Sequence, residues 1–355
     1  MNSATTCRPW QGGATQKVQA SMAPLHRFEA VEELETQLRA AGLDLRLLQL
    51  SNGNLSGHLV TRQLGPLRLL RLQVNRCLHV AGGKPRDQRL MALNLVSDRN
   101  APPLRAHGTA IGSDALFGLD PLADVHLSTP ERMDLAVVMV NPGMLTRWSS
   151  GKGSLDLGSA PFRFNVLPID AASRTPLQRW LLNLLPLHSK TPSAPAPSEP
   201  EGSAEGLLPL LVDALEQGLR QQGWPDRPPA RIELVKQVQR WTEEHPLEPI
   251  SLEALCREMY VGRRTLIQGF REHLGMGPMA YFKLQRLHGV RRGLLEAQPG
   301  SATISGLAAS WGFLNAGHFA RDYRRLFGEL PSATLSSRRG LARGEHGTAL
   351  DHSLS

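Results

Sequence analysis

WGFLNAGHFARDYRRLFGELP, residues 311–331, has the pattern of a short helix that packs by one face. It opens on an aromatic-Gly-aromatic turn and ends at a Gly and a Pro. Phe319 and Tyr323 are four residues apart, so they lie on one helix face, whereas Arg321 and Arg324 point elsewhere. The stretch therefore predicts a helix that is anchored by aromatic side chains and presents arginines on its other side.

A second copy of this pattern occurs 53 residues earlier in the chain. FREHLGMGP (270–278) matches YRRLFGELP (323–331) in its aromatic residue, Arg, large apolar residue, Gly and Pro. Further upstream, Leu255 matches Leu307 at an offset of 52, so the second copy has one extra residue in its turn. Shared spacing at this many positions predicts one supersecondary unit that is built twice.

Each copy predicts a helix-turn-helix unit. In the first, Ser251 caps one helix and the second helix runs over 263–274. In the other copy, Thr303 caps the first helix, and Asn315 caps a helix that continues to Phe327. Arg and Gln side chains read base edges in the major groove, and Arg and Lys hold phosphates. The outward positions of the two second helices are Arg264, Gln268 and Arg271 in the first copy and Gly317, Arg321 and Arg324 in the other.

The segment between the units, residues 278–297, predicts a rigid spacer helix. Pro278 suits the first helical position. A helix of about 20 residues spans about 30 Å, close to the ~34 Å between adjacent major-groove faces on one side of DNA. The spacer would therefore seat both units on one side of a duplex. The apolar residues expected to pack it against both units are Leu284, Leu287, Val290 and Leu294.

The positive charge of the chain gathers in this region. The chain of 355 residues carries a net charge of +8, and residues 231–340 hold 16 Lys and Arg against 10 Asp and Glu, a balance of +6. Such a face is often simply solvated, but the two units and the spacer favour duplex DNA as the partner. We expect Arg291 and Arg292 to contact DNA of any sequence. The basic residues within 263–292, opposed by Glu272 alone, are Arg263, Arg264, Arg271, Lys283, Arg286, Arg291 and Arg292.

Residues 231–335 resemble the DNA-binding domain of AraC/XylS-type transcription regulators. AASWGFLNAGHFARDYRRLFGELPSATL is similar to the family's second helix-turn-helix signature, and LEALCREMYVGRRTLIQGFREHLGMGPMAYFKLQRL to the first. The resemblance implies seven helices, two bound major-groove segments and action at promoters. The base-facing positions that it implies are Arg264, Ile267 and Gln268 in the first unit, and Ala316, Gly317, His318, Ala320 and Arg321 in the second.

A few positions depart from the family pattern. Tyr260 stands where the first turn usually has Gly, and Gly262 where a Ser usually caps the next helix. Residues 333–335, Ala-Thr-Leu, replace the usual Tyr-Arg after the final Pro. The second recognition helix starts with Ala316 and Gly317, which allow close backbone approach or contact with a thymine methyl but form no side-chain hydrogen bonds to bases.

The amino-terminal half predicts a β-rich domain. Short apolar runs over 50–170, separated by Gly, Pro, Asp and Asn, are typical of a small barrel or sandwich and weakly resemble the cupin-type domain. Residues 27–42 predict an amphipathic helix that ends at Gly42. Two further apolar helices, expected at 175–187 and 207–223, would pack on each other, across a dimer, or simply onto the β-rich domain. Many AraC/XylS-type proteins join such a sensor and dimerisation domain to their DNA-binding domain.

The predicted fold class is α+β, with a β-rich N-terminal domain and an all-α C-terminal domain whose two helix-turn-helix units are joined by a long helix. A Pro/Ser/Ala/Glu-rich stretch marks the linker. The expected division is a disordered tail at 1–24, a sensor and dimerisation domain with flanking helices at 25–187, a flexible linker at 188–206, a connecting helix and linker at 207–230, the DNA-binding domain at 231–335, and a disordered tail at 336–355.

No enzyme signature is present. Cys7, Cys77 and Cys256 are scattered, which fits a reducing cytosol and does not fit the zinc-bound cysteine cluster of a methyl-acceptor repair module. No nucleophile elbow, P-loop or GxGxxG occurs, and we expect no catalytic residue, metal or cofactor. The histidines of the β-rich half lack metal-ligand spacing and are expected at the surface or in hydrogen bonds. They are His58, His79, His107 and His126.

The predicted function is that of a sequence-specific transcription regulator in the bacterial cytoplasm, associated with the nucleoid. Its expected partners are double-stranded promoter DNA, a small-molecule effector, a second copy of the chain and RNA polymerase. No membrane is expected, because no apolar run approaches about 18 residues and no secretory signal is visible. The alternatives are an architectural DNA-binding protein without ligand sensing and a β-barrel enzyme with a DNA-binding tail.

Overall fold

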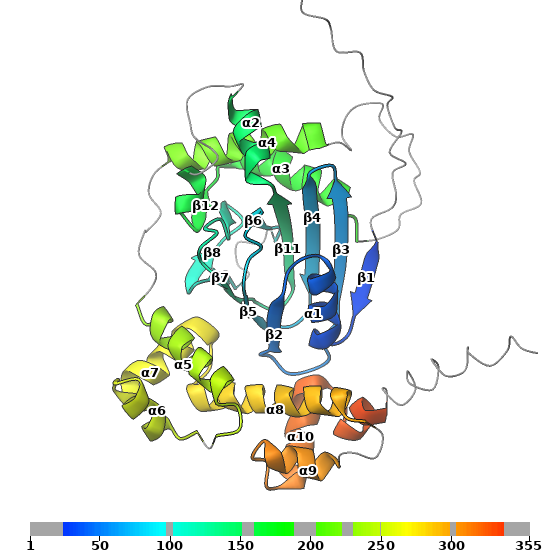
Figure 1. Ribbon diagram of the computed structural model, residues 1–355, viewed down its shortest axis with the longest axis vertical. Helices are drawn as coiled ribbons and strands as arrows, with labels where there is room; N and C mark the ends of the chain where they lie inside the picture. Colours follow the sequence, from blue (N-terminus) through cyan, green and yellow to red (C-terminus); the bar gives the residue numbers. More distant parts are fainter. Residues whose placement is uncertain are drawn as a thin grey trace, which may run out of the picture.

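The computed structural model describes residues 24–96, 102–150, 160–187, 204–221, 230–248, 250–298 and 303–336. They form a β-rich domain and a helical domain that lies at one end of it (Figure 1). The predicted α+β class, with an all-α C-terminal domain, is confirmed. The predicted tails and linker lie, except at their edges, outside the described residues.

The β-rich domain consists of two antiparallel sheets. The larger sheet has the order β1 (Leu25–Phe28), β3 (Gly57–Leu64), β4 (Leu67–Val74), β11 (Met133–Val140), β6 (Arg89–Asn94), β9 (Ala115–Phe117) and β12 (Val166–Pro168). The smaller sheet has the order β2 (Leu45–Gln49), β5 (Leu78–Gly82), β10 (Val125–Ser128), β7 (Leu104–Ala106) and β8 (Thr109–Ile111).

A turn at Gly65 joins β3 to β4 as an antiparallel hairpin, with Leu64 opposite Leu67. Gly65 has φ +55°, a conformation that glycine adopts without a steric penalty. The strands begin earlier than the sequence pattern indicated, which placed them from residue 50 onward. The expected helix at 27–42 is preceded by β1 and starts as α1 (Val31–Ala40), and β2 lies ahead of residue 50.

Two apolar cores flank the larger sheet. Along β11, Leu135 and Val137 point into the core between the two sheets, which α1 also lines, while Ala136 and Val138 point to the outer face. Helices α2 (Pro142–Ser150), α3 (Ala171–Leu184) and α4 (Ala204–Arg220) cover that outer face. This arrangement explains why both faces of β11 are apolar, and it closes the sheet against solvent on both sides.

Helices α3 and α4 are the two apolar helices whose packing partner the sequence left open. Helices α3 and α4 pack on each other and share one core with the larger sheet. Gly218 of α4 lies so close to β12 that an added Cβ would be 2.8 Å from the carbonyl oxygen of Pro168. Helix α4 is thus a part of the β-rich domain and not a free connecting element.

Among its described residues, the helical domain contains the seven helices that the family resemblance implies. The six longer ones are α5 (Ile232–Glu244), α6 (Leu252–Glu258), α7 (Arg263–Leu274), α8 (Pro278–Glu296), α9 (Ile304–Ser310) and α10 (Ala316–Phe327), and residues 331–336 form a last short helix. Among the described helices, none is long and apolar enough to cross a lipid bilayer.

Candidate nucleic-acid interface

Helices α6 and α7 form the first helix-turn-helix unit. The Ser251 hydroxyl accepts a hydrogen bond from the backbone N–H of Ala254 at 3.0 Å, so the predicted N-cap of α6 is confirmed. Leu255, Leu266 and Phe270 are fully buried. The Phe270 ring meets the Tyr281 ring edge-to-face, with the ring centroids 5.6 Å apart. One face of α7 is therefore fixed in the core, as its sequence predicts.

Helices α9 and α10 form the second unit by the same means. The Thr303 hydroxyl accepts from the N–H of Gly306 at 3.0 Å, and the Asn315 side chain accepts from the N–H of His318 at 2.9 Å. Both predicted caps are confirmed. Phe319 and Tyr323 are buried with their rings 5.6 Å apart. The aromatic face of the 311–331 stretch is thus the face that anchors α10.

The turns of the two units show why the family favours Gly at one position. Gly312 in the second turn has φ +81°, and Tyr260 at the matching place in the first has φ +51°. A side chain at positive φ costs conformational energy that Gly avoids. Tyr260 is 95% exposed, so its ring gains no packing in return.

The outward faces of α7 and α10, the two recognition helices, carry the residues predicted from sequence. Ile267 and Ala320 are partly buried at the edge of each core. The exposed members of the predicted set are Arg263, Arg264, Gln268, Arg271, Ala316, Gly317, His318, Arg321 and Arg324. The structure thus brings the set onto two helix surfaces, one in each unit.

Some of the predicted side chains of α7 form polar contacts within the protein, and others do not. Gln268 donates to the Glu272 carboxylate at 2.9 Å, and Arg231 of the same domain forms an ion pair with Glu272 at 3.0 Å. Arg263 lies 3.6 Å from Glu253 of α6. Arg264 has no ion pair among the described residues, which leaves its guanidinium available to an anionic partner.

Spacer helix α8 contacts both units, as predicted. Its 19 residues span about 28 Å at 1.5 Å each. Leu287, Val290 and Leu294 pack into the core of the second unit, and Leu284 lies against the cores of both. Lys283 adds an ion pair to Asp322 of α10 at 2.6 Å. The two units are therefore held on one shared helix.

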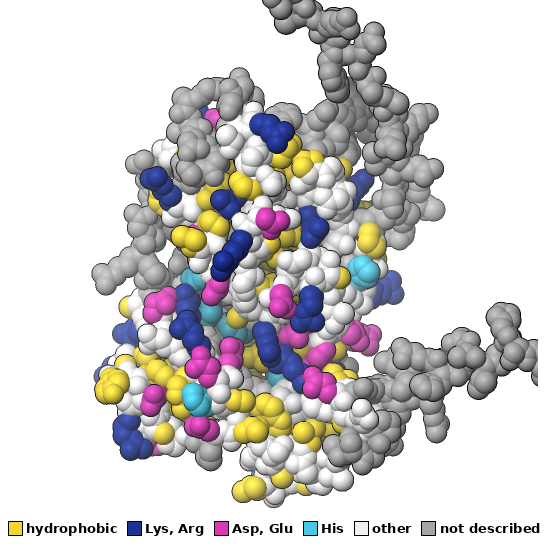
Figure 2. All heavy atoms as spheres, viewed as in Figure 1, with side chains coloured by type: hydrophobic (Ala, Val, Ile, Leu, Met, Phe, Trp, Pro, Cys, Tyr) yellow, Lys and Arg dark blue, Asp and Glu magenta, His cyan; other side chains and the backbone are white. Residues whose placement is uncertain are grey.

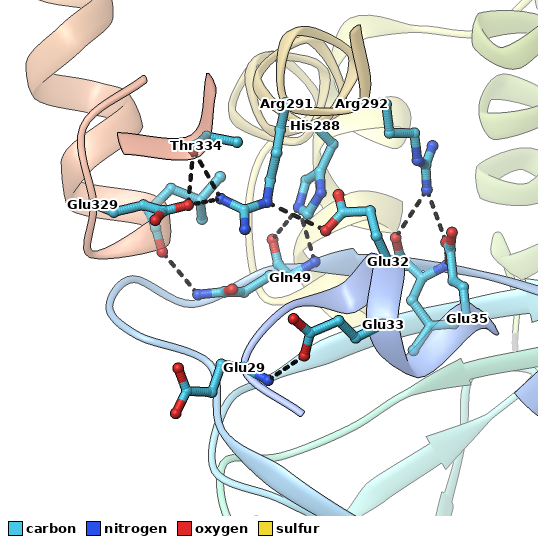
Figure 3. Close-up of polar contacts among 12 residues, drawn as sticks. Glu29, Glu32, Glu33, Glu35, Gln49, His288, Arg291, Arg292, Glu329 and Thr334 are labelled. Atoms are coloured by element: carbon cyan, nitrogen blue, oxygen red, sulfur yellow. Dashed lines mark hydrogen bonds and ion pairs between the residues drawn. The ribbon is translucent and has the colours of Figure 1, made fainter. Parts of the chain in front are cut away.

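The expectation that Arg291 and Arg292 contact DNA is wrong. Arg291 is buried between Glu32 of α1 and Glu329, and Arg292 pairs with Glu35 of α1 at 2.8 Å (Figure 3). A buried guanidinium needs paired carboxylates to offset its desolvation. Here Glu32 and Glu35 come from the N-terminal domain, and Glu329 comes from the helical domain. These two arginines therefore join the domains and are occupied in this arrangement.

Further contacts join the N-terminal domain to α8 and α10. The Gln49 N–H donates to His288 Nε2 at 2.9 Å, and the Gln49 side chain donates to the carbonyl oxygen of Leu326 at 2.8 Å (Figure 3). The N–H of Gly53 donates to the carbonyl oxygen of Arg325 at 3.0 Å. The end of α10, whose last carbonyls have no partner within the helix, is thus satisfied by the loop after β2.

A second polar cluster joins the smaller sheet to α5 and α8. Gln239 of α5 is 4% exposed and bridges His126 at 2.8 Å, His79 at 3.1 Å and the Tyr281 hydroxyl at 3.1 Å. Burial, and then the neighbouring His126, lowers the pKa of His79 to about 3. Sequence reasoning missed this cluster, although Gln239 follows Val235 by one helical turn on an apolar face and so signals a buried polar partner.

A cleft of about 600 Å³ opens beside this cluster, between the smaller sheet and α5. His79, His107 and His126 line it together with Lys236 and Glu233 of α5. Burial, and then the charge of Lys236, lowers the pKa of His107 to about 3. Figure 2 shows basic, acidic and histidine side chains mixed along the junction of the domains. In the described part of the chain, no group of three His, Cys, Asp or Glu side chains is arranged to hold a metal.

Comparison with known proteins places the helical units in a family. A helix-turn-helix domain model matches residues 255–337. The chain is 34% identical over 126 residues to the XylDLEGF operon transcriptional activator 2 of Pseudomonas putida, a match that covers 36% of this chain and 78% of that protein. The chain belongs to the AraC/XylS family.

Other AraC/XylS relatives agree over part of their length. The probable thc operon regulatory protein of Rhodococcus erythropolis is 34% identical over 132 residues, covering 37% of this chain and 40% of that protein. The chain thus matches about two fifths of that relative. A solved structure of a probable AraC family transcriptional regulator from Rhodopseudomonas palustris is 38% identical, covers 30% of this chain and 97% of that one, and has a TM-score of 0.28.

Because α8 approaches the second unit closely at Gly289, an alanine substitution there should destabilise the protein. A Cβ added at Gly289 would lie 2.3 Å from the Trp311 ring, so we expect Gly289→Ala to destabilise the chain by about 1–3 kcal/mol through overpacking. Gly317→Ala on the exposed start of α10 is the control, because nothing lies closer than 3.5 Å there. Urea unfolding of the full chain measures both, and a Gly289→Ala protein as stable as wild type would contradict the packing.

Proposed function

We propose that this protein is a sequence-specific DNA-binding transcription regulator that reads two adjacent major-groove segments. The observation that carries the proposal is the placement of two recognition helices on one buried spacer helix, each with its apolar face in a core and its polar face exposed. Membership of the AraC/XylS family supports the same function. The chain would act in the bacterial cytoplasm, at the nucleoid, with promoter DNA as its partner.

The two recognition helices would contribute unequally. Arg264 and Gln268 are exposed on α7 and carry the side-chain types that read base edges, with Ile267 beside them for apolar contact. Helix α10 begins with Ala316 and Gly317, so its base contacts would come from His318 and Arg321. Arg263, Arg271 and Arg324 would position the helices on the phosphates, and Ala320 at the surface edge would make apolar contact with a base.

We also propose that the N-terminal domain modulates this activity. The cleft beside Gln239 is the candidate effector site, because its lining brings cationic, anionic and neutral polar groups together next to the DNA-binding domain. A second copy of the chain and RNA polymerase would be protein partners of a regulator of this kind. An architectural DNA-binding protein without sensing is the alternative, and it predicts that no small molecule changes the footprint.

Base readout by α7 is tested with Arg264→Ala and Gln268→Ala. Each should cost about 1–3 kcal/mol on a preferred site and little on scrambled DNA, because base contacts carry the sequence information. The matched control is Arg39→Ala, an exposed arginine of α1 in the β-rich domain. Fluorescence anisotropy on duplexes selected by the wild-type protein measures the affinities. Equal losses on both DNAs for Arg264→Ala would make it a phosphate contact.

The role of the shared spacer helix is tested by changing the distance between the two DNA segments. The protein should protect two segments about 10 base pairs apart on one face of the duplex. Five base pairs inserted between them rotate one segment by about half a turn and should abolish specific binding, whereas an insertion of about ten should restore part of it. Footprinting on the three duplexes measures this. Unchanged affinity after the five-base-pair insertion would mean that one unit alone touches bases.

The effector site is tested by filling the cleft. Ala123 lines it, and its neighbour Leu122 is 93% exposed, so Ala123→Trp and Leu122→Trp form a matched pair. A metabolite that raises the melting temperature of the wild type should act equally on Leu122→Trp and lose its effect on Ala123→Trp. Thermal-shift measurement of the full chain against a metabolite panel provides the data. A shift that persists in Ala123→Trp would place the ligand elsewhere.

A further inference from the structure

Three histidines are buried where the N-terminal domain meets the DNA-binding domain. His79 of β5 and His126 of β10 meet α5, with exposed fractions of 3% and 8%. His288 of α8 meets β2 and is fully buried. They occupy two separate clusters, one beside the first helix-turn-helix unit and one beside the second. Each cluster contains a glutamine from the opposite domain, Gln239 for the first pair and Gln49 for His288.

The hydrogen bonds of the first cluster fix where the protons are. The Gln239 side-chain oxygen lies 2.8 Å from His126 Nε2, so this ring nitrogen must donate. The Gln239 amide nitrogen lies 3.1 Å from His79 Nε2, which must accept. His79 Nδ1 lies 3.0 Å from the carbonyl oxygen of Leu127 and must donate. His79 therefore has one donor and one acceptor nitrogen, the pattern of a neutral ring.

The second cluster imposes the same condition. The backbone N–H of Gln49 donates to His288 Nε2 at 2.9 Å, and this nitrogen can accept only while it carries no proton. The Gln49 carbonyl oxygen lies farther from the same nitrogen, at 3.3 Å, so the shorter contact is the one that a neutral ring satisfies. A second proton on either His79 or His288 would set two N–H groups against each other. It would also place a positive charge on a buried ring. Protonation thus opposes both sets of contacts that hold the domains together.

The charged groups around these rings do not offset such a proton. His288 has Arg291 and Arg292 beside it on α8, and their carboxylate partners from α1 are already paired. From α10 it meets only the edge of the Phe327 ring, at 5.0 Å. His79 and His126 have His107 of the smaller sheet, Lys236, Glu233 and Gln239 of α5, and Tyr281 of α8 around them. The cleft beside them is also lined by Asp120, Asp124, Arg240 and Glu243. Lys236 and Glu233 pair with each other at 2.7 Å.

We propose that His79 and His288 form an acid-sensitive latch: the N-terminal domain stays docked on the DNA-binding domain while these rings are neutral, and proton uptake releases it. Undocking exposes the rings to water, where a second proton has no bonding cost. Acid therefore favours the released form, by the rule that protons shift an equilibrium toward the state that binds more of them. The recognition faces are exposed in the docked form, so the latch controls how the units are held and not whether they are covered.

The pH window follows from the two states. A free histidine has a pKa near 6.5, and burial lowers the pKa of His79 and of His288 to about 3. Docking is thus strongest above pH ~6.5 and weakens as pH falls below it. Between pH 7.5 and 5.5 each of these two rings should reduce the docking constant about 10-fold, or on the order of 100-fold together. Carboxylates titrate near 4 in model peptides, so this window lies above the titration of the ion pairs.

The test reads the junction directly through two amide protons. Gln49 and Gly53 donate their backbone N–H groups across it, so their hydrogen-exchange protection reports docking. In the full chain, protection of the 45–54 segment, corrected for the chemical exchange rate at each pH, should fall on the order of 100-fold from pH 7.5 to 5.5. Protection of β11, inside the larger sheet, should not change. Flat protection of 45–54 over this range would overturn the proposal.

Variants separate the latch from general acid sensitivity. The double variant His79→Gln/His288→Gln keeps an acceptor near each ring nitrogen and cannot take up a proton, so its 45–54 protection should hold at pH 5.5. His26→Gln, at an exposed position of β1, is the control and should keep the wild-type slope. A double variant that retains that slope would refute the role of these rings.

If the double variant fails to dock at pH 7.5, a variant that adds a negative charge beside the histidines tests the latch instead. Gln239→Glu puts a carboxylate against His79 and His126, where it would stabilise their protonated forms in the docked state. Its 45–54 protection should lose less than that of the wild type between pH 7.5 and 5.5. A loss equal to or greater than that of the wild type would contradict the latch.

Discussion

The packing of one helix against both helix-turn-helix units and the N-terminal domain is the constraint on which the rest of this structure depends. Helix α8 is nearly enclosed: Tyr281 and Phe282 enter the first unit's core, and Leu287, Val290 and Leu294 enter the second's. Arg291 and His288 take the remaining side against the N-terminal domain. In the docked form, contacts on several sides of α8 hold the two recognition helices and the sheets in one mutual arrangement.

The packing of α8 also neutralises part of the positive charge of this region. The sequence places seven basic residues between 263 and 292, but Lys283, Arg291 and Arg292 form ion pairs within the protein. Their positive charge is neutralised locally and adds little to the field at a distance. The field that attracts a polyanion must come instead from unpaired arginines on the recognition helices, such as Arg264 and Arg321. Net charge counted along a sequence therefore overstates the attraction from the spacer and understates that of the two exposed faces.

How far the sequence predicts the structure depends on the range of the interactions. The caps at Ser251, Thr303 and Asn315, and the turn at Gly65, were predictable because each involves residues a few positions apart. The repeat predicted both units and the spacer for the same reason. The link between Gln49 and His288 spans 239 positions, and nothing near either residue indicates its partner. Whether the predicted base-facing residues touch bases stays a prediction, since it depends on a partner outside the chain.

The separation of the two polar clusters gives the protein a specific way to couple its domains. Gln239 ties the smaller sheet to the first unit, and Gln49 ties β2 to the end of α10 in the second. Because both units pack on α8, DNA that prefers a different spacing of the units would act on both ties. By thermodynamic linkage, two factors must be equal. One is the factor by which bound DNA loosens the junction, and the other is the factor by which a loosened junction changes DNA affinity. A proton or an effector at the cleft would then act on DNA binding through the spacing of the two units, without touching either recognition helix.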